Sequence, residues 1–160
     1  MSTGIVYFSK SNNTKTGAEY LSEKLGASIT RLIDKKNLDA GAAIKHELSD
    51  LEGDPWDAIK DCDRVIVMSP IWAFSGVPAM DTFLQKADFT GKEIIIVTFS
   101  AFGKGFIAKR VHHIYTSKIE KAGGSVIGKW ALKGARPDQY AGDAVLHKRV
   151  DQILPEIMAL

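Results

Sequence analysis

The sequence contains three short runs that are almost continuously apolar and rich in β-branched or aromatic residues: 5–8, 65–68 and 94–99. Strands buried on both faces of a sheet have this composition, whereas a strand with one wet face alternates apolar and polar residues. Two further segments, 28–33 and 126–133, do alternate. The pattern therefore predicts three central strands and two edge strands.

Between these runs, apolar residues recur at the three- and four-residue spacing of an amphipathic helix. The apolar residues that mark the predicted helices lie within 18–25, 80–87, 107–122 and 144–154, and the first of these helices is expected to start near Lys15. Gly26 and Pro78 mark helix boundaries, and Pro155 is expected to end or kink the last helix. Segment 34–57 is less regular, and its apolar residues Ile44, Leu48 and Leu51 suggest a short helix within a long connection.

Five alternations of strand and helix predict an α/β fold in three layers, a doubly wound parallel sheet covered by helices on both faces. With the first, third and fourth strands central, the simplest spatial order is 2-1-3-4-5. In that order the connections diverge between strands one and three, where a ligand-binding crevice opens at the carboxyl ends of the strands. We expect residues 1–160 to form a single domain.

A polar loop, Ser9-Lys10-Ser11-Asn12-Asn13-Thr14, follows the first strand and leads directly into a helix. Hydroxyl, amide and free backbone N–H groups at a helix N-terminus can enclose a phosphate. The same residues are also ordinary helix caps and turn formers. Neither the G-x-x-x-x-G-K-[ST] loop nor the G-x-G-x-x-G fingerprint occurs.

Two more loops, 69–78 and 100–105, follow central strands and carry aromatic residues where polar ones are usual. A planar ligand stacked on Trp72 would account for its place in a loop, although Trp72 or Phe74 can instead fold back onto the core. Gly103 and Gly105 allow close approach of the backbone to a ligand.

These loops carry a resemblance to flavodoxins that extends over essentially the whole chain. Residues 9–14 are similar to the T-x-T-G-N-T phosphate loop of that family, and residues 69–84 are similar to its P-[IV]-[YW]-W-G-x-x-P-x-x-x-x-F-L pattern. The resemblance implies non-covalent FMN, with the phosphate on Ser9, Ser11, Asn13 and Thr14 and the isoalloxazine between the second and third loops. The implied cofactor-binding residues are Ser9, Ser11, Asn12, Asn13, Thr14, Pro70, Ile71, Trp72, Ala73, Phe74, Ser100, Ala101, Phe102, Gly103 and Gly105.

The chain also departs from the family pattern. Asn12 replaces the glycine of the phosphate loop, so that the turn needs either an ordinary backbone angle or a left-handed asparagine. Ala73-Phe74 stands where relatives often have a glycine. The long insertion of long-chain flavodoxins is absent, which fits the short-chain type. Flavodoxins that carry electrons are usually acidic, whereas the pI of this sequence is about 8.6, which implies different partners.

The resemblance implies an electron carrier with no catalytic residue, which exchanges electrons with redox partner proteins or with a small-molecule donor or acceptor, as a monomer or homodimer. Lys104 is the charge best placed in the sequence to raise the flavin potential. The alternative is an FMN-dependent NAD(P)H:quinone-type oxidoreductase whose substrate surface includes Trp72, Phe74 and Phe102. The chain lacks the acidic residues of a receiver domain after its first and third strands. It also lacks the G-x-S-x-G elbow of a serine hydrolase.

The 21 basic and 19 acidic residues are spread along the chain without a block of like charge, so no nucleic-acid partner is expected. No apolar run approaches the roughly 18 residues of a membrane span, and the first residues lack a signal pattern, so we expect a soluble, cytoplasmic protein. The single cysteine, Cys62, excludes an internal disulfide. His112 and His113 adjoin on a helix and are not spaced for a shared metal, so no metal site is expected.

Overall fold

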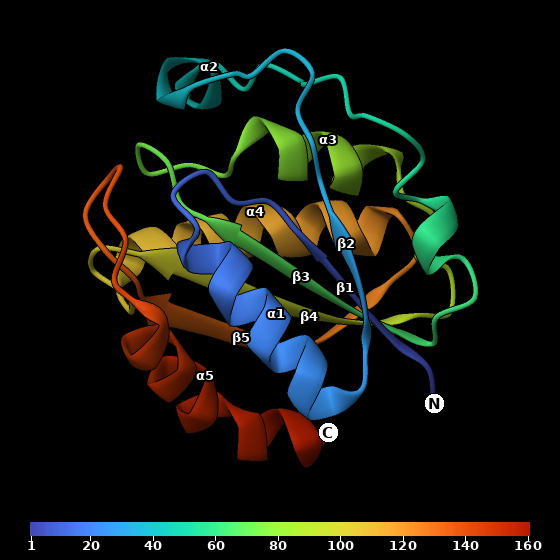
Figure 1. The fold of residues 1–160 in the computed structure, drawn as a ribbon. Coiled ribbons are helices and arrows are strands. Elements are labelled where there is room, and N and C mark those ends of the chain that lie inside the picture. Colours follow the sequence, from blue (N-terminus) through green and yellow to red (C-terminus); the bar gives the residue numbers. More distant parts are fainter.

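In the computed structural model, which describes residues 1–160, a five-stranded sheet lies between two layers of helices (Figure 1). All neighbouring strands pair in parallel, in the order β2-β1-β3-β4-β5. This is the predicted order. The strands are β1 (Thr3–Tyr7), β2 (Ser28–Arg31), β3 (Arg64–Pro70), β4 (Glu93–Ser100) and β5 (Ser125–Lys133).

The central strands are the three apolar runs of the sequence. Almost every residue of β1, β3 and β4 is buried, because helices cover both faces of the sheet. The edge strands keep exposed residues, and Ile29 of β2 is 40% exposed. Burial on both faces thus explains why continuous apolar runs became the middle of the sheet and alternating segments its edges.

Two pairs of helices cover the two faces of the sheet (Figure 1). Alternate side chains of the central strands reach one pair or the other. In β1, Ile5 and Tyr7 belong to the apolar cluster that includes α1 and α5 residues, whereas Val6 belongs to the cluster with α3 and α4. The helices are α1 (Asn13–Leu25), α2 (Ala40–Ile44), α3 (Pro78–Lys86), α4 (Phe106–Lys121) and α5 (Asp143–Met158), with a 3-10 turn at Asp57–Ile59.

One predicted helix was wrong in its extent, and one of the two effects expected of Pro155 does not occur. The short helix in the long connection, α2, begins after Asp39, whose carboxylate caps it by accepting from the Ala42 N–H, and it ends at Ile44. Leu48 and Leu51 therefore lie outside it. Pro155 does not end α5, which continues to Met158, because the buried side chain of Ile157 holds the last turn on the sheet.

The charges are divided more unevenly than the prediction held. No run of more than two consecutive like charges occurs, but residues 94–137, which form most of β4, α4 and β5, contain eight basic residues and a single acidic one, Glu120. This segment therefore carries a formal charge of +7, against −5 for the remaining 116 residues. One edge of the sheet and its covering helix are strongly basic. No helix has the length and apolar character needed to cross a membrane.

Candidate functional site

The loops after β1, β3 and β4 meet at the carboxyl edge of the sheet (Figure 1). The chain leaves β1 toward α1 on one face and leaves the neighbouring β3 toward α3 on the other. In this strand order the divergence marks the switch point, the place where ligands of doubly wound sheets bind. The structure thus brings together the three loops that the sequence singled out.

The first loop presents a continuous series of unpaired backbone donors. None of the seven N–H groups from Ser9 to Lys15 donates a hydrogen bond within the protein, and the first N–H to do so is that of Thr16, to the Asn12 carbonyl oxygen at 3.0 Å. A helix alone leaves only its first few N–H groups unpaired. Here the preceding turn adds further donors at the positive end of the α1 dipole, which suits an anion.

Two hydroxyl side chains complete this loop. Ser9 and Thr14 are 5% and 1% exposed, and neither hydroxyl bonds another protein group. Asn12 has a left-handed backbone, with φ 68°. Of the two conformations expected for an asparagine in place of the loop glycine, the structure thus shows the left-handed one. Arg31 of β2 supports the loop from behind by donating from Nη2 to the Ser9 carbonyl oxygen at 3.1 Å.

The side chain of Asn13 faces away from the role implied for it. Its Nδ2 donates to the Gln139 carbonyl oxygen at 2.8 Å, and its Oδ1 accepts from the Ala141 N–H at 2.9 Å. Asn13 therefore clamps the first loop to the loop 134–142, which follows β5. Its amide group is occupied, and only its backbone N–H remains open to a ligand.

Loop 134–142 was missed by sequence reasoning. Besides the Asn13 clamp, the hydroxyl of Tyr140 lies 2.7 Å from that of Thr16 on α1 and donates to Asp143. The loop reaches α1 because α1 and α5 pack side by side on one face, where Tyr20 donates to Asp151 at 2.9 Å. The predicted parallel sheet could have identified this fourth loop. In such a sheet the carboxyl end of β5 lies at the same edge as those of β1, β3 and β4.

The second loop makes a tight turn at its tip. The Trp72 and Ser75 backbones bond each other in both directions, at 3.1 and 2.8 Å, around Ala73 and Phe74. Both central residues have positive φ, 47° and 64°, as in a type I′ turn, and each non-glycine residue in this region costs about 1 kcal/mol. Phe74 is 63% exposed, so the alternative that it folds back onto the core is wrong.

Trp72 is half-buried and lies against the first loop. Phe8 meets its ring edge-on, with centroids 5.4 Å apart, and the Lys10 ammonium lies 5.5 Å from its centroid. The indole also packs against the apolar cluster beneath α3 and α4. The structure therefore gives Trp72 some of the core contact that was its alternative role, and the residue stays partly exposed beside the first loop.

A buried tyrosine fixes the second loop from below. The hydroxyl of Tyr115 on α4 lies 3.0 Å from that of Ser69 and accepts from the Val77 N–H at 3.3 Å. Burial strongly raises the pKa of Tyr115, so that it stays protonated. A Cβ on Gly76 would lie 2.6 Å from the tyrosine ring, so only glycine fits there. The ends of the loop are rigidly held, although its tip is exposed.

The third loop is anchored on β5. Ser100 accepts from the Gly103 N–H at its hydroxyl (3.0 Å) and from the Gly134 N–H at its carbonyl (2.8 Å). Gly103 has φ 65°, and a Cβ there would approach the Lys133 nitrogen to 3.2 Å. Phe102 is 79% exposed and Phe106, at the start of α4, is 81% exposed. Two aromatic rings therefore stand in solvent beside this loop.

Neither histidine of α4 belongs to the site. His112 is buried, not at the surface, and its Nε2 lies 2.8 Å from the Thr98 hydroxyl. Burial, with a smaller contribution from Lys129, lowers the pKa of His112 to about 4. His113 is exposed. No group of three or more His, Cys, Asp or Glu side chains is arranged to hold a metal ion.

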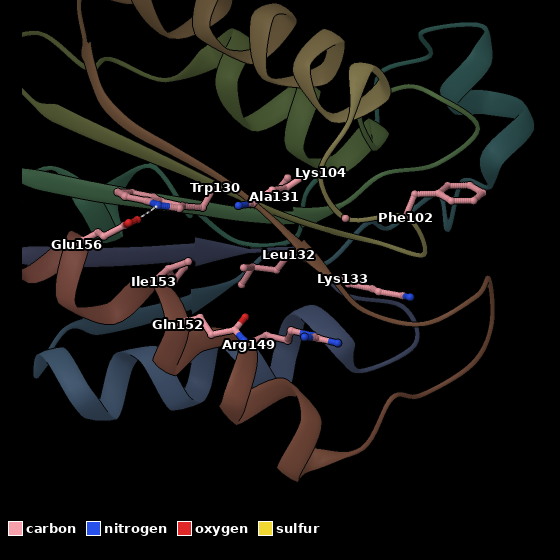
Figure 2. A pocket seen from close by; sticks show the side chains of 11 residues that line it. Phe102, Lys104, Trp130, Ala131, Leu132, Lys133, Arg149, Gln152, Ile153 and Glu156 are labelled. Atoms are coloured by element: carbon pink, nitrogen blue, oxygen red, sulfur yellow. Dashed lines mark hydrogen bonds between the residues drawn. The ribbon is translucent and has the colours of Figure 1, made fainter.

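A separate groove of about 260 Å³ lies behind the third loop, between β5 and α5 (Figure 2). Trp130 lines it and donates from Nε1 to Glu156 at 2.5 Å. Phe102 and Lys133 belong to its rim, and Figure 2 shows the Phe102 ring projecting away from the other lining residues. No residue of the first loop lines this groove, so it lies apart from the switch point between β1 and β3.

No family model and no curated protein matches the sequence. The fold does match solved structures. A candidate flavoprotein from Bacteroides eggerthii gives a TM-score of 0.75 at 14% identity, covering 99% of this chain and 98% of that one. A flavoprotein in complex with FMN from Lactobacillus acidophilus gives 0.64 at 19% identity, covering 86% and 93%. Oxidised flavodoxin 2 from Bacillus cereus gives 0.60 at 16% identity, covering both chains completely. The chain thus has the flavodoxin fold.

Proposed function

We propose that this protein binds FMN non-covalently at the carboxyl edge of its sheet and transfers electrons. The observation that carries the proposal is the run of seven unpaired N–H groups from Ser9 to Lys15, together with the unbonded hydroxyls of Ser9 and Thr14. A phosphate would supply acceptors for these hydroxyls and for several backbone donors at once. The similar protein from Lactobacillus acidophilus, whose structure contains FMN, supports the choice of cofactor.

The chain's contribution to phosphate binding comes mainly from backbone donors. In this proposal the hydroxyls of Ser9, Ser11 and Thr14 donate to the phosphate alongside the loop N–H groups, while Asn13 contributes its N–H and holds the neighbouring loop with its amide. The α1 dipole adds favourable interaction with the negative charge. No lysine or arginine is needed for this binding, and Arg31 acts by fixing the loop backbone.

The second and third loops hold the flavin ring. Trp72 offers a partly exposed indole beside the first loop, with the Lys10 ammonium over its ring. The unpaired N–H groups of Ala73, Phe74 and Gly76 line the second loop. When bound, FMN supplies the isoalloxazine that accepts and releases electrons. The chain orients that ring, limits its exposure and stabilises its charge, which requires no catalytic acid or base.

The first prediction concerns cofactor content. We expect the purified protein to bind one FMN per chain, because the donors of the first loop match a single phosphate group. The measurement is the visible absorption spectrum, with the released flavin identified and its phosphate assayed. Protein that stays colourless after incubation with excess FMN would disprove the proposal.

Replacing Trp72 with Ala should weaken FMN and riboflavin about equally, each by roughly tenfold, since both ligands carry the ring and aromatic stacking with burial provides about 1.5 kcal/mol. Dissociation constants follow from quenching of flavin fluorescence. Trp56→Ala is the matched control, because Trp56 stacks on Phe83 away from the three loops. Unchanged flavin affinity in Trp72→Ala would exclude this residue from the ring site.

The exposed rings of Phe74 and Phe102 favour a second candidate, an FMN-dependent NAD(P)H:quinone-type oxidoreductase with a substrate surface on these loops. The two functions differ in hydride transfer. Oxidation of NADPH by the FMN-loaded protein, followed at the nicotinamide absorption band, would establish the enzyme. Reduction by a one-electron donor without NADPH turnover would establish the carrier.

A further inference from the structure

The basic segment and the exposed aromatic rings occupy adjoining parts of the molecule. Phe102 and Phe106 stand at the carboxyl end of β4 and the start of α4, and α4 then continues with Lys109 and Arg110. Phe106, Arg110 and His113 are spaced by four and three residues, so that they share the solvent face of the helix. One surface thus joins aromatic rings to positive charge.

The cations of this surface are not neutralised within the protein. Lys104, Lys109, Arg110 and Lys133 are exposed, and none forms a salt bridge. By contrast Lys118, farther along α4, pairs with Asp81 at 3.2 Å. In Figure 2 the side chain of Lys133 points to the same side of β5 as the ring of Phe102. The surface therefore has unpaired charge beside exposed apolar area.

We propose that this surface, formed by Phe102, Lys104, Phe106, Lys109, Arg110 and Lys133, docks an acidic redox protein. The inference rests on the proposed function, because it borders the third loop, where the flavin ring would lie. Aromatic residues and arginine are enriched at protein interfaces, and complementary charge steers association. The occupant is acidic because the segment carries +7 and only one carboxylate.

A nucleic acid fits this surface less well than an acidic protein. The remaining 116 residues carry a formal charge of −5, which repels a long polyanion that extends beyond the basic edge. An acidic protein presents its charge over a limited area and leaves the rest of the molecule free. It also brings an apolar surface that can cover the rings of Phe102 and Phe106, each about four-fifths exposed.

The test uses two haem proteins of opposite charge as probes, acidic cytochrome b5 and basic cytochrome c. In each reaction one electron leaves the reduced flavin of this protein and converts the ferric haem to ferrous. At low ionic strength we expect faster reduction of cytochrome b5, with a rate that falls as salt is added. Lys109→Glu/Arg110→Glu should slow this reduction about tenfold, within the usual range of electrostatic steering.

Lys24→Glu/Lys148→Glu is the matched control, because it changes net charge equally on the opposite helix layer and should alter the rate less than twofold. Isothermal titration calorimetry with oxidised cytochrome b5 measures docking without any flavin. It therefore distinguishes a failure of docking from a failure of FMN binding. Equal rates and equal cytochrome b5 affinities in wild type and Lys109→Glu/Arg110→Glu would overturn the proposal. A second result would also overturn the proposal. In it, the wild-type protein shows no preference between the two cytochromes but binds duplex DNA at physiological ionic strength, and Lys109→Glu/Arg110→Glu abolishes the DNA binding.

Discussion

Replacing Thr14 with Val should weaken FMN by about 10- to 100-fold and leave riboflavin within twofold of wild type. The hydroxyl of Thr14 is held at the start of α1 with no partner in the protein, and a hydrogen bond to a charged group contributes about 1.5–3 kcal/mol. Valine has nearly the same shape, so the packing of this buried side chain is retained. Paired titrations with FMN and riboflavin, which differ by the phosphate, measure the effect directly.

This substitution should have little effect on the folded protein without flavin. Because the Thr14 hydroxyl bonds no protein group, its removal breaks no internal hydrogen bond, and urea unfolding should give a similar free energy for the two proteins. Thr16→Val is the matched control, since the Thr16 hydroxyl is already committed to Tyr140. Equal losses for FMN and riboflavin in Thr14→Val would remove this residue from the phosphate site.

The second large effect is on stability at acidic pH. The pKa of His112 is lowered to about 4 from an ordinary 6.5, chiefly by burial. Between these two pH values the unfolded chain therefore binds a proton at this imidazole and the folded protein does not. The stability that this residue contributes is complete above pH 6.5 and is lost as the pH falls toward 4. Over that interval the loss is up to about 3 kcal/mol, at 1.36 kcal/mol per pKa unit.

His112→Gln should make unfolding less dependent on pH over this interval, because an amide can keep the bond to Thr98 and does not titrate. Urea unfolding at several pH values, with wild type and variant compared at each, gives the difference. His113→Gln, at the exposed neighbouring position, serves as the control. Parallel pH profiles for wild type and His112→Gln would show that burial of this imidazole does not control acid stability.

The fold was predictable because burial on both faces leaves a direct mark in the sequence. Residues 5–8, 65–68 and 94–99 have the composition of central strands, and 2-1-3-4-5 is the simplest strand order that places them there. The connection 34–57 was harder, because its helix covers only Ala40–Ile44 and its contacts are not periodic. A five-residue helix held by one cap at Asp39 has no repeating apolar pattern to detect.

The candidate site was predictable in its loops but not in all of its side chains. Short polar residues before a helix identified the first loop, and the left-handed Asn12 was one of the two stated alternatives. The clamp by Asn13 and the support by Tyr115 were not predictable, because each depends on residues far apart in the chain. Asn13 and Gln139 are separated by 126 positions, and no local pattern encodes such a pairing.

The Asn13 clamp also has a consequence for biosynthesis. Because the first loop is secured by residues 139 and 141, its final shape requires a segment that is synthesised more than 120 residues after Asn13. The strand next to β1 on the inner side, β3, emerges earlier but does not supply this clamp. The first loop therefore takes its final shape only after β5 and the loop that follows it have been synthesised.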